Sequence, residues 1–326
     1  MNRAKQRYFI CFLPKQSHSR SFGLGSINNC PSGGGLIKDP ERSKMERYEI
    51  LSKRSLNSTV SEMVIDAPGV ARHAQPGQFI ILRSHADGER IPLTIAASDS
   101  GKGTVTIIYQ IVGGATMRLD SLEAGDHLAD FAGPLGRASE VEGIKKVAVV
   151  GGGVGCAIAL PVAKKLHDLG AEVHMIAGFR SKDIVILEEE MKAASSRFIL
   201  MSDDGTVGKK GLVTDALREL LEAGEKYDEV ITIGPLPMMK FVCLLTKEYG
   251  VKTVASMNPV MVDGTGMCGG CRLTVGGKTK FACVDGPEFD GHEIDFDEAM
   301  TRSRMYRTFE AEKRDHECNL LKAGKE

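Results

Sequence analysis

The 326-residue chain has no tryptophan, almost no net charge and no long apolar run. A formal net charge of −1 gives no reason to expect nucleic acid or an anionic membrane as a partner. No apolar stretch approaches the roughly 18 residues of a membrane-spanning helix. The eight cysteines do not form the dense framework of a small secreted protein, since three of them cluster near the end of the chain. We therefore expect a cytoplasmic protein without nucleic-acid or membrane partners.

The first 44 residues lack acidic side chains until Asp39 and carry several basic ones, together with many Gly, Ser and Asn residues. A basic, acid-poor start is compatible with an organelle transit peptide. The composition favours a disordered or non-native extension instead, because the patterned part of the chain opens at Met45. We assign residues 1–44 to such an extension.

Residues 45–143 read as short strands separated by Gly, Pro and Asp turns, which is typical of a small antiparallel barrel. The expected strands are Glu49–Arg54, Val60–Asp66, Gln78–Ser84, Leu93–Ser98, Thr104–Ile111 and His127–Ala132, with a helix over Thr116–Leu122.

From residue 144 to 256 strands alternate with helices, which predicts a parallel sheet covered on both faces. The expected strands are Lys146–Val150, Glu172–Ala177, Phe198–Met201, Glu229–Ile233 and Thr253–Ala255. The expected helices run from the glycine loop to Leu169 and over Ile184–Ala194, Val213–Ala223 and Leu236–Tyr249. Residues 257–326 hold a cysteine segment, a predicted hairpin of Arg272–Val275 with Lys280–Cys283, and a charged helical tail.

A glycine loop joins the first α/β strand to its helix: Gly151, Gly152, Gly153 and Gly155, with Cys156 where a dinucleotide fingerprint would have its third glycine. Backbone N–H groups at such a helix start hold an anion. No acidic residue ends the second strand, where Arg180 stands instead. The loop predicts a phosphate site, although a tight turn without a ligand has the same pattern, and Cys156 is expected to be a packed side chain.

Two stretches of the barrel are candidates for a flavin. Arg90, Pro92, Leu93 and Thr94 form an Arg-x-Pro-x-Thr sequence at a strand start, where the arginine can hold a diphosphate and the hydroxyl a flavin edge. A second candidate anion site precedes the short helix at Gly113, Gly114 and Thr116. Taken alone, these stretches are equally compatible with a solvated arginine and an ordinary turn.

The cysteine segment places Asp263, Cys268, Cys271 and Cys283 in the spacing Asp-x4-Cys-x2-Cys-x11-Cys. Thiolates at C-x-x-C spacing with a distant third indicate a metal or iron–sulfur site. A zinc ion held by the three thiols with His292 or Asp263 is an alternative. A thioredoxin-like redox pair fits less well, because no strand leads into a helix there and the third thiol would have no role.

The order of barrel, glycine-rich α/β domain and cysteine segment resembles the ferredoxin–NADP reductase superfamily. Arg90-x-Pro-x-Thr94 is similar to its flavin motif, in which tyrosine usually stands at the position of Leu93, and Tyr109 is a possible substitute for that ring. Gly133-Pro-Leu-Gly136 and the glycine loop resemble further motifs of the family, as do Gly234 and Pro235, which usually lie near the nicotinamide. The resemblance implies FAD on the barrel and NAD(H) on the α/β domain.

Within that superfamily the cysteine segment resembles the electron-transfer subunit of dihydroorotate dehydrogenase, which holds a [2Fe–2S] cluster with four cysteines. Asp263 takes the place of the first cysteine, as in the small subunit of NADH-dependent reduced ferredoxin:NADP oxidoreductase and in sulfide dehydrogenase small subunits. The resemblance implies a heterodimer with a larger subunit that carries a second flavin and [4Fe–4S] clusters and that bifurcates electrons, with ferredoxin as an indirect partner.

The implied chemistry requires no general acid or base, and we expect no catalytic side chain. Arg180 and Lys182 could accept the 2′-phosphate of NADPH, whereas the resemblance implies NADH. A dihydroorotate dehydrogenase subunit is a competing hypothesis, and a flavin-free regulator that uses its cluster as a sensor is a non-enzymatic one.

Overall fold

The computed structural model describes the backbone of residues 48–323 and the side chains up to Asn319. The proposed extension of residues 1–44 lies outside the described residues. The described residues belong to one compact unit. No helix among the described residues is long and apolar enough to cross a membrane.

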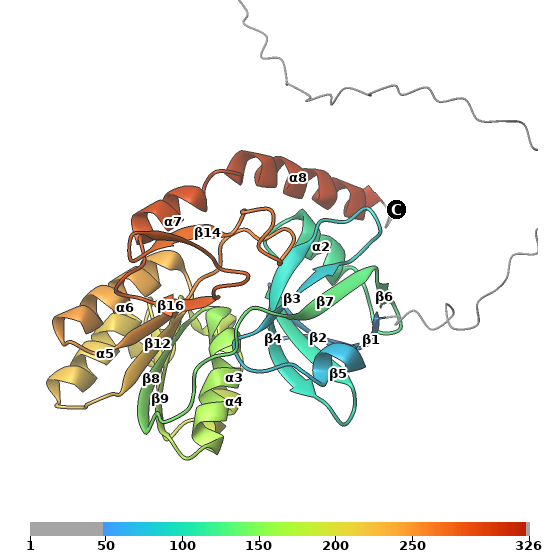
Figure 1. Cartoon of the computed structure of the whole chain (residues 1–326). Helices are drawn as coiled ribbons and strands as arrows, with labels where there is room; N and C mark the ends of the chain where they lie inside the picture. The colour runs from blue at the N-terminus through green and yellow to red at the C-terminus, as the bar shows by residue number, and fades with distance from the viewer. Residues whose placement is uncertain (1–47, 324–326) are drawn as a thin grey trace, which may run out of the picture. The chain divides into compact units, whose positions relative to one another are not determined.

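The first sheet is an antiparallel, nearly closed barrel (Figure 1). Its strands are β1 (Tyr48–Ser55), β2 (Val60–Asp66), β3 (Phe79–Arg83), β4 (Ile91–Asp99), β5 (Thr104–Gln110), β6 (His127–Leu128) and β7 (Asp130–Leu135). They pair in the order β6-β1-β2-β5-β4-β3-β7. Because β6 and β7 are consecutive in the chain, one segment pairs with both ends of the sheet. Alternating residues such as Met63, Ile65 and Ile107 fill the interior.

The predicted strands of the barrel are all present, with three differences. The strand expected over 127–132 divides at Ala129 into β6 and β7, because each half pairs with a different neighbour. The helix α2 (Gly114–Asp120) begins two residues before the predicted start. A short helix, α1 (Pro68–Ala71), occupies a stretch that was expected to be only a turn, with Pro68 at its first position.

The second sheet has the order β11-β10-β9-β8-β12-β13-β16. Its strands are β8 (Lys146–Gly152), β9 (Glu172–Phe179), β10 (Arg197–Ser202), β11 (Lys209–Lys210), β12 (Glu229–Ile233), β13 (Thr253–Ser256) and β16 (Glu288–Asp290). All neighbours are parallel except the last, because β16 pairs antiparallel with β13. The predicted parallel sheet is therefore confirmed, and β16 adds one antiparallel strand at its edge. The proposed division of the chain at 44, 143 and 256 stays a prediction.

Helices cover both faces of this sheet (Figure 1). They are α3 (Gly155–Asp168), α4 (Glu188–Ala193), α5 (Val213–Glu222) and α6 (Leu236–Glu248). One core packs around α3 and a second around α5 and α6. The prediction of a single helix over 184–194 is wrong. A 3-10 turn, η2 (Lys182–Ile184), precedes α4, and Leu187 between them has a φ of +55°. A left-handed residue cannot continue a right-handed helix.

The last segment contains the hairpin β14 (Arg272–Val275) and β15 (Lys278–Phe281), then α7 (Phe296–Arg302) and α8 (Arg307–Ala323). The predicted second strand of the hairpin is two residues too late. Gly276 and Gly277, both with positive φ, make the two-residue turn, so Val275 pairs with Lys278 and Cys283 lies beyond the hairpin. A third core joins this segment to α6 and to Phe79 and Ile81 of the barrel.

Candidate functional site

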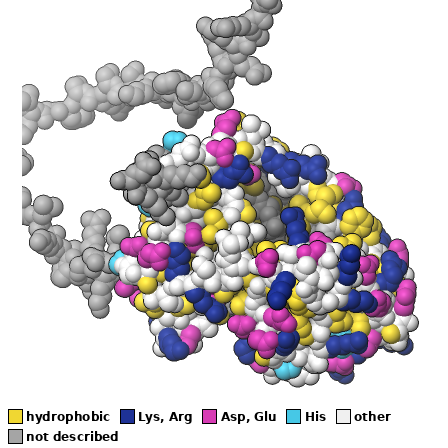
Figure 2. Space-filling view, turned by 180° about the vertical axis from the view of Figure 1, so that it is seen from behind, with side chains coloured by type: hydrophobic (Ala, Val, Ile, Leu, Met, Phe, Trp, Pro, Cys, Tyr) yellow, Lys and Arg dark blue, Asp and Glu magenta, His cyan; other side chains and the backbone are white. Residues whose placement is uncertain are grey.

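A cavity of about 1380 Å³ opens where the barrel strands β4 and β5 face the ends of β8, β9 and β12. Figure 2 shows a hollow in one face of the molecule, with Lys and Arg side chains along its rim. The cavity brings together most of the residues predicted for cofactor binding from both sheets. These are Pro92, Leu93, Thr94, Tyr109, Gly152, Gly153, Gly155, Arg180, Gly234 and Pro235.

The glycine turn between β8 and α3 forms one wall of this cavity. The N–H of Gly153 donates to the carbonyl of Gly178 across 2.9 Å, and its φ of +56° is a left-handed conformation that favours glycine. A Cβ added at Gly155 would collide with the carbonyl oxygen of Ile233, so only glycine lets α3 start this close to β12. The turn thus presents the N-terminus of a 14-residue helix to the cavity, which is the geometry of a phosphate site.

Gly151 lies beneath the turn and does not line the cavity. A Cβ there would meet the Sγ of Cys156 at 2.9 Å. Cys156 is fully buried, and this burial raises the pKa of its thiol to about 12. The residue is a packed side chain, as expected, and it fits against Gly151 because that residue has no Cβ.

An acidic residue that the sequence analysis missed lies on the cavity wall. Asp203 follows β10, and its N–H donates to the carbonyl of Phe179 at the end of β9 across 3.1 Å. This bond places Asp203 beside Arg180, which also lines the cavity. The acid of a dinucleotide site was expected after the second strand of the domain, whereas this one follows the third. The Asp-Asp-Gly sequence after a buried strand was the available signal.

In the barrel, Pro92, Leu93 and Thr94 lie on β4 and reach the cavity. Tyr109 is only 1% exposed, and its hydroxyl donates to Oδ1 of Asp120 across 3.0 Å. Burial and the adjacent carboxylate raise the pKa of this phenol. The Tyr109 side chain is therefore held from inside the barrel by Asp120.

Arg90 does not line the cavity, although it begins the same motif. Its Nε donates to the backbone carbonyl of Val262 across 3.1 Å. Val262 is the residue before Asp263. The motif thus contacts the cavity through β4 and the cysteine segment through its arginine.

The second candidate anion site is separate from the cavity. The hydroxyl of Thr116 accepts hydrogen bonds from the N–H groups of Val112 and Gly113, both at 3.0 Å. Gly114 packs against α8, where a Cβ would meet side-chain atoms of Lys313 and Glu317. The structure does not bring Gly113, Gly114 and Thr116 together with the other predicted residues.

The cysteine segment has a buried base and an exposed tip. Cys271 and Cys283 are buried with their sulfur atoms 3.2 Å apart, whereas Cys268 is exposed next to Met267, which is 88% exposed. Backbone N–H groups point at two of the sulfurs: Gly270 donates to Cys268 Sγ and Cys283 donates to Cys271 Sγ, both at 3.4 Å. Such N–H···S contacts stabilise thiolates, which are the form that binds iron.

Asp263 is the fourth predicted ligand. Its carboxylate accepts hydrogen bonds from the N–H of Thr265 at 3.0 Å and from the N–H of Cys268 at 2.9 Å. The Thr265 and Cys268 bonds hold the pKa of Asp263 below its ordinary value. The carboxylate is therefore ionised near neutral pH, and it lies in the same loop as the exposed thiol.

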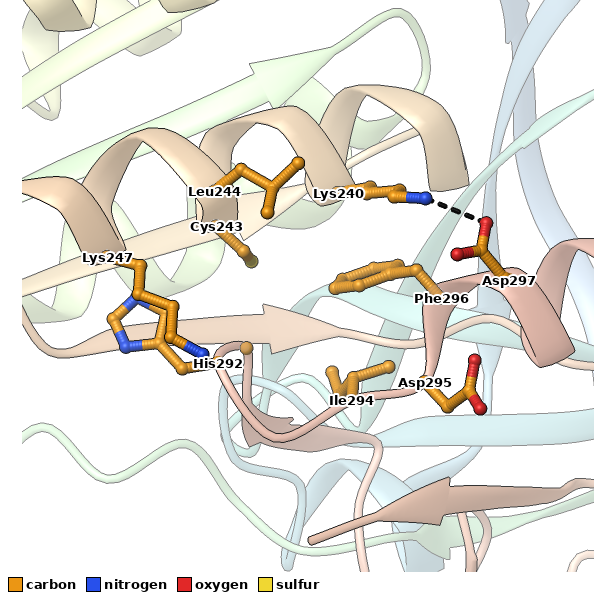
Figure 3. A pocket seen from close by; sticks show the side chains of 10 residues that line it. Lys240, Cys243, Leu244, Lys247, His292, Ile294, Asp295, Phe296 and Asp297 are labelled. Carbon is orange, nitrogen blue, oxygen red and sulfur yellow. Dashed lines mark hydrogen bonds and ion pairs between the residues drawn. The ribbon is translucent and has the colours of Figure 1, made fainter. Parts of the chain in front are cut away.

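The spacing of these ligands bears on the zinc alternative. The proposed ligand atoms are a carboxylate oxygen of Asp263 and the sulfurs of Cys268, Cys271 and Cys283. Among the described residues, no three of these atoms all lie within 4.8 Å of one another. Sulfur ligands on one tetrahedral zinc are roughly 3.8 Å apart. A cluster with two metal ions spreads its ligands more widely. His292 bonds through Nε2 to Thr246 Oγ1 at 3.0 Å and lines a small pocket of about 150 Å³ beside α6 (Figure 3). None of the three thiols lines that pocket.

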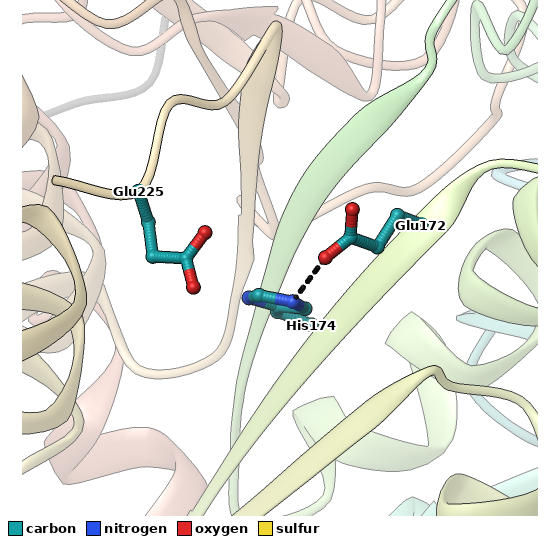
Figure 4. Close-up of side chains that lie close together, drawn as sticks. All are labelled: Glu172, His174 and Glu225. Carbon is teal, nitrogen blue, oxygen red and sulfur yellow. Dashed lines mark hydrogen bonds and ion pairs between the residues drawn. The ribbon is translucent and has the colours of Figure 1, made fainter.

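Another group of potential ligands lies at the opposite end of the sheet: Glu172, His174 and Glu225 (Figure 4). Lys146 already supplies a cation there, with its Nζ 2.9 Å from Glu172 and 2.6 Å from Glu225. The ring of His174 bonds to Tyr227 and Glu172 through its two nitrogens. This network is a satisfied structural ion-pair cluster and needs no metal.

Comparison with known proteins assigns the cysteine segment. Residues 258–295 match the model of the iron–sulfur cluster binding domain of dihydroorotate dehydrogenase B. A dihydroorotate dehydrogenase B (NAD(+)) electron transfer subunit homolog of Thermotoga maritima is 45% identical over 276 residues, covering 85% of this chain and 96% of that protein. The chain belongs to this family of electron transfer subunits. The electron transfer subunit of Fusobacterium nucleatum is 33% identical and covers 78% of this chain and all of that protein.

Among solved structures, a chain from the NADH-dependent reduced ferredoxin–NADP oxidoreductase, described in connection with flavin-based electron bifurcation, is 42% identical with a TM-score of 0.79. The match covers 83% of this chain and 97% of that one. A ferredoxin reductase of carbazole 1,9a-dioxygenase, 19% identical with a TM-score of 0.54 over 63% of this chain and 65% of that one, shares the fold. This electron transfer subunit is thus an oxidoreductase subunit of the ferredoxin–NADP reductase type.

Proposed function

We propose that this electron transfer subunit passes electrons between NAD(H), FAD and a [2Fe–2S] cluster, as the small subunit of an electron-bifurcating NADH-dependent ferredoxin:NADP oxidoreductase. The carrying observation is that one cavity is lined both by the flavin motif of β4 and by the glycine turn of α3, while Arg90 of that motif contacts the cysteine segment. Electron transfer from the nucleotide through the flavin to the cluster requires the three sites to be neighbours in this order.

The residues present fit each of the three groups. The α3 N-terminus with Gly153 suits the nucleotide diphosphate, and Thr94 is a hydroxyl residue on the barrel wall of the cavity, where a flavin ring would bind. Asp263, Cys268, Cys271 and Cys283 supply one carboxylate and three thiolates, two of which receive N–H···S contacts. When bound, the flavin and the cluster convert two-electron hydride chemistry into single-electron transfers.

The small-subunit assignment rests on the resemblance at Asp263. The chain is 42% identical to the chain from the bifurcating enzyme, 45% identical to the T. maritima homolog and 33% identical to the dihydroorotate dehydrogenase B subunit of F. nucleatum, so identity by itself does not separate the two functions. The described thiols outside the cysteine segment, those of Cys156, Cys243 and Cys318, belong to no cluster of potential ligands among the described residues. Further clusters therefore belong to a partner, which we propose is a larger subunit with a second flavin and [4Fe–4S] clusters. Ferredoxin would be reached through that subunit, and the cytoplasmic location stays a prediction.

The test is purification of the native complex together with analysis of this subunit alone. We expect about one FAD and two iron atoms per chain, an EPR signal on reduction, and bleaching by NADH rather than NADPH. Steady-state KM values for both nucleotides decide the donor, and a strong NADPH preference contradicts the NADH assignment. A colourless protein that contains zinc contradicts the cluster.

The competing functions give different results in the same experiment. A partner that oxidises dihydroorotate would identify a dihydroorotate dehydrogenase subunit, a function favoured by the 45% identity to the T. maritima homolog. A partner that acts on sulfide would identify a sulfide dehydrogenase. Full cluster content without any flavin would instead support a cluster sensor.

A further inference from the structure

Four arginines from four parts of the fold converge on the cysteine segment. Arg90 precedes β4, Arg137 follows β7, Arg272 begins β14 and Arg302 ends α7. Each donates a side-chain hydrogen bond to a backbone carbonyl of the segment. The bonds are Arg90 Nε to Val262 (3.1 Å), Arg137 Nε to Val284 (3.2 Å), Arg272 to Gly269 (3.1 Å) and Arg302 to Gly270 (3.2 Å).

The four carbonyls have a common position relative to the proposed ligands. Val262 directly precedes Asp263, Gly269 follows Cys268, Gly270 precedes Cys271 and Val284 follows Cys283. Every proposed ligand therefore has one arginine bonded to the carbonyl of its neighbour in the chain. Contacts made to ordinary surface loops would not select these four positions.

The positive charges of these arginines are not neutralised locally. Among the described residues, none of the four has a carboxylate within 4.0 Å in an ion pair, whereas Arg83 and Arg118 do. Guanidinium groups keep their charge at all ordinary pH values. Four permanently charged side chains are thus bonded to the backbone of the segment, and none of them forms an ion pair among the described residues.

One of these contacts reaches a sulfur through a single peptide group. The carbonyl of Gly269 accepts from Arg272, and the N–H of the same peptide, that of Gly270, donates to Cys268 Sγ at 3.4 Å. A donor on the carbonyl polarises the peptide and strengthens the hydrogen bond that its N–H makes. Arg272 therefore acts on the exposed thiolate without touching it.

We propose that Arg90, Arg137, Arg272 and Arg302 form a cationic frame that positions the cysteine segment and raises the reduction potential of the cluster held there. This inference rests on the proposed [2Fe–2S] site. Three thiolates and a carboxylate contribute four negative charges, and one-electron reduction adds another. Cations close to the ligands stabilise the more negative, reduced form, and hydrogen bonds to sulfur act in the same direction.

The experiment is an EPR-monitored redox titration of the purified subunit with variants at three of these positions. Arg90 is left unchanged because it belongs to the flavin motif. We expect Arg272→Gln, Arg302→Gln and Arg137→Gln each to lower the midpoint potential at unchanged iron content, with Arg272→Gln also altering the EPR line shape. Arg302→Lys, which keeps the charge and loses the planar fork, should fall between wild type and Arg302→Gln.

The matched control is Arg304→Gln. Arg304 lies two residues after Arg302 and is exposed, and no side-chain contact joins it to the cysteine segment among the described residues. Removing the charge of Arg304 should shift the midpoint potential by less than half of the shift caused by Arg302→Gln. An equal shift would show a general charge effect and overturn the frame, as would wild-type midpoints in the glutamine variants with full clusters.

A second set of variants covers glutamine variants that fail to assemble the cluster. Lysine replacements at Arg137 and Arg272 keep the charge and lose the planar fork, so their midpoints should fall only slightly below that of the wild type; midpoints equal to or above the wild type with full clusters overturn the proposal. If the wild-type protein itself lacks iron and an EPR signal, the proposed function fails, whereas unchanged midpoints in variants with full clusters contradict the arginine frame alone.

Discussion

The backbone N–H of Cys268 donates a hydrogen bond to Oδ2 of Asp263 across 2.9 Å. Together with the bond from Thr265 to Oδ1, it fixes the carboxylate in the loop that carries the exposed thiol. Both oxygens keep lone pairs for a metal ion, because each accepts one N–H. The loop therefore holds an ionised oxygen donor close in the chain to the exposed thiol of Cys268.

Replacing Asp263 tests whether that donor is a ligand. We expect Asp263→Cys to retain two iron atoms per chain and to change the midpoint potential and EPR g-values, because a soft thiolate replaces a hard oxygen. Asp263→Ala should lose most of the iron. The measurement is iron and labile sulfide content followed by EPR.

Asp204→Ala serves as the control, since its carboxylate likewise accepts an N–H within its own turn, from Thr206 at 2.9 Å, but lies outside the segment. It should leave iron content and EPR unchanged. An identical spectrum in Asp263→Cys and the wild type would show that Asp263 is only a turn residue.

Substitutions at two glycines of the α3 turn distinguish an effect on nucleotide binding from an effect on folding stability. At Gly153 an added Cβ meets no atom within 4 Å, so Gly153→Ala costs only the strain of its positive φ, roughly 1–2 kcal/mol. At Gly155 the methyl group collides with the Ile233 carbonyl, which should cost about 3 kcal/mol. We expect Gly153→Ala to weaken NADH binding about tenfold or more with a small loss of stability, and Gly155→Ala to lower the melting temperature strongly.

Isothermal titration with NADH and thermal unfolding measure the two effects. Wild-type NADH affinity in Gly153→Ala would place the nucleotide elsewhere in the cavity.

The position of Asp203 leads us to expect a preference for NADH over NADPH. A carboxylate beside Arg180 can accept a hydrogen bond from a ribose hydroxyl of NADH, and it repels the 2′-phosphate of NADPH. Asp203→Asn should therefore raise kcat/KM for NADPH relative to NADH by about tenfold, equivalent to about 1.4 kcal/mol. Asp204→Asn is the matched control, because its carboxylate bonds to Thr206 and does not line the cavity. A ratio that moves equally in both variants would contradict the assignment.

The sequence predicted the barrel and most of the α/β strands because their apolar residues alternate or run continuously between Gly and Pro turns. Its errors lie where long-range pairing decides. The edge strand β16 is three residues long and exists only because Ala255 and its neighbours offer an open edge. Leu187 breaks an otherwise helical pattern through a backbone angle that its side chain does not reveal.

For the site, local motifs predicted the glycine turn, which the structure shows, and four ligands, which stay a prediction, since each motif lies within one stretch of chain. Asp203 was missed because β10, the strand that precedes it, becomes a neighbour of β9 only in the folded sheet. The arginine contacts were likewise not predictable: Arg90 and Val262 are 172 residues apart. Such contacts depend on how the barrel, hairpin and α7 pack together.

Glu288 on β16 makes the stability of the protein depend on pH. Burial raises the pKa of this carboxyl to about 7, and the hydroxyl of Ser139 donates to it at 2.7 Å. Below pH 4.5, its ordinary value, the group is protonated in both the folded and the unfolded chain, and it imposes no penalty. As the pH rises toward 7 the unfolded chain releases its proton while the folded chain retains it. Stability is therefore lost across this interval and stays lower above it.

Glu288→Gln should remove that dependence, because the amide keeps an oxygen for Ser139 and never ionises. At pH 8 the variant should be more stable than the wild type by up to about 3 kcal/mol, whereas at pH 4.5 the two should be nearly equal. Urea unfolding at both pH values gives the difference. Glu142→Gln is the control, because Glu142 is an exposed carboxylate that is not among the groups raising the pKa of Glu288; it should change the stability by the same small amount at both pH values. Parallel stability profiles for wild type and Glu288→Gln between pH 4.5 and 8 would show that Glu288 ionises normally, so that β16 pairs with β13 without any burial penalty from this carboxylate.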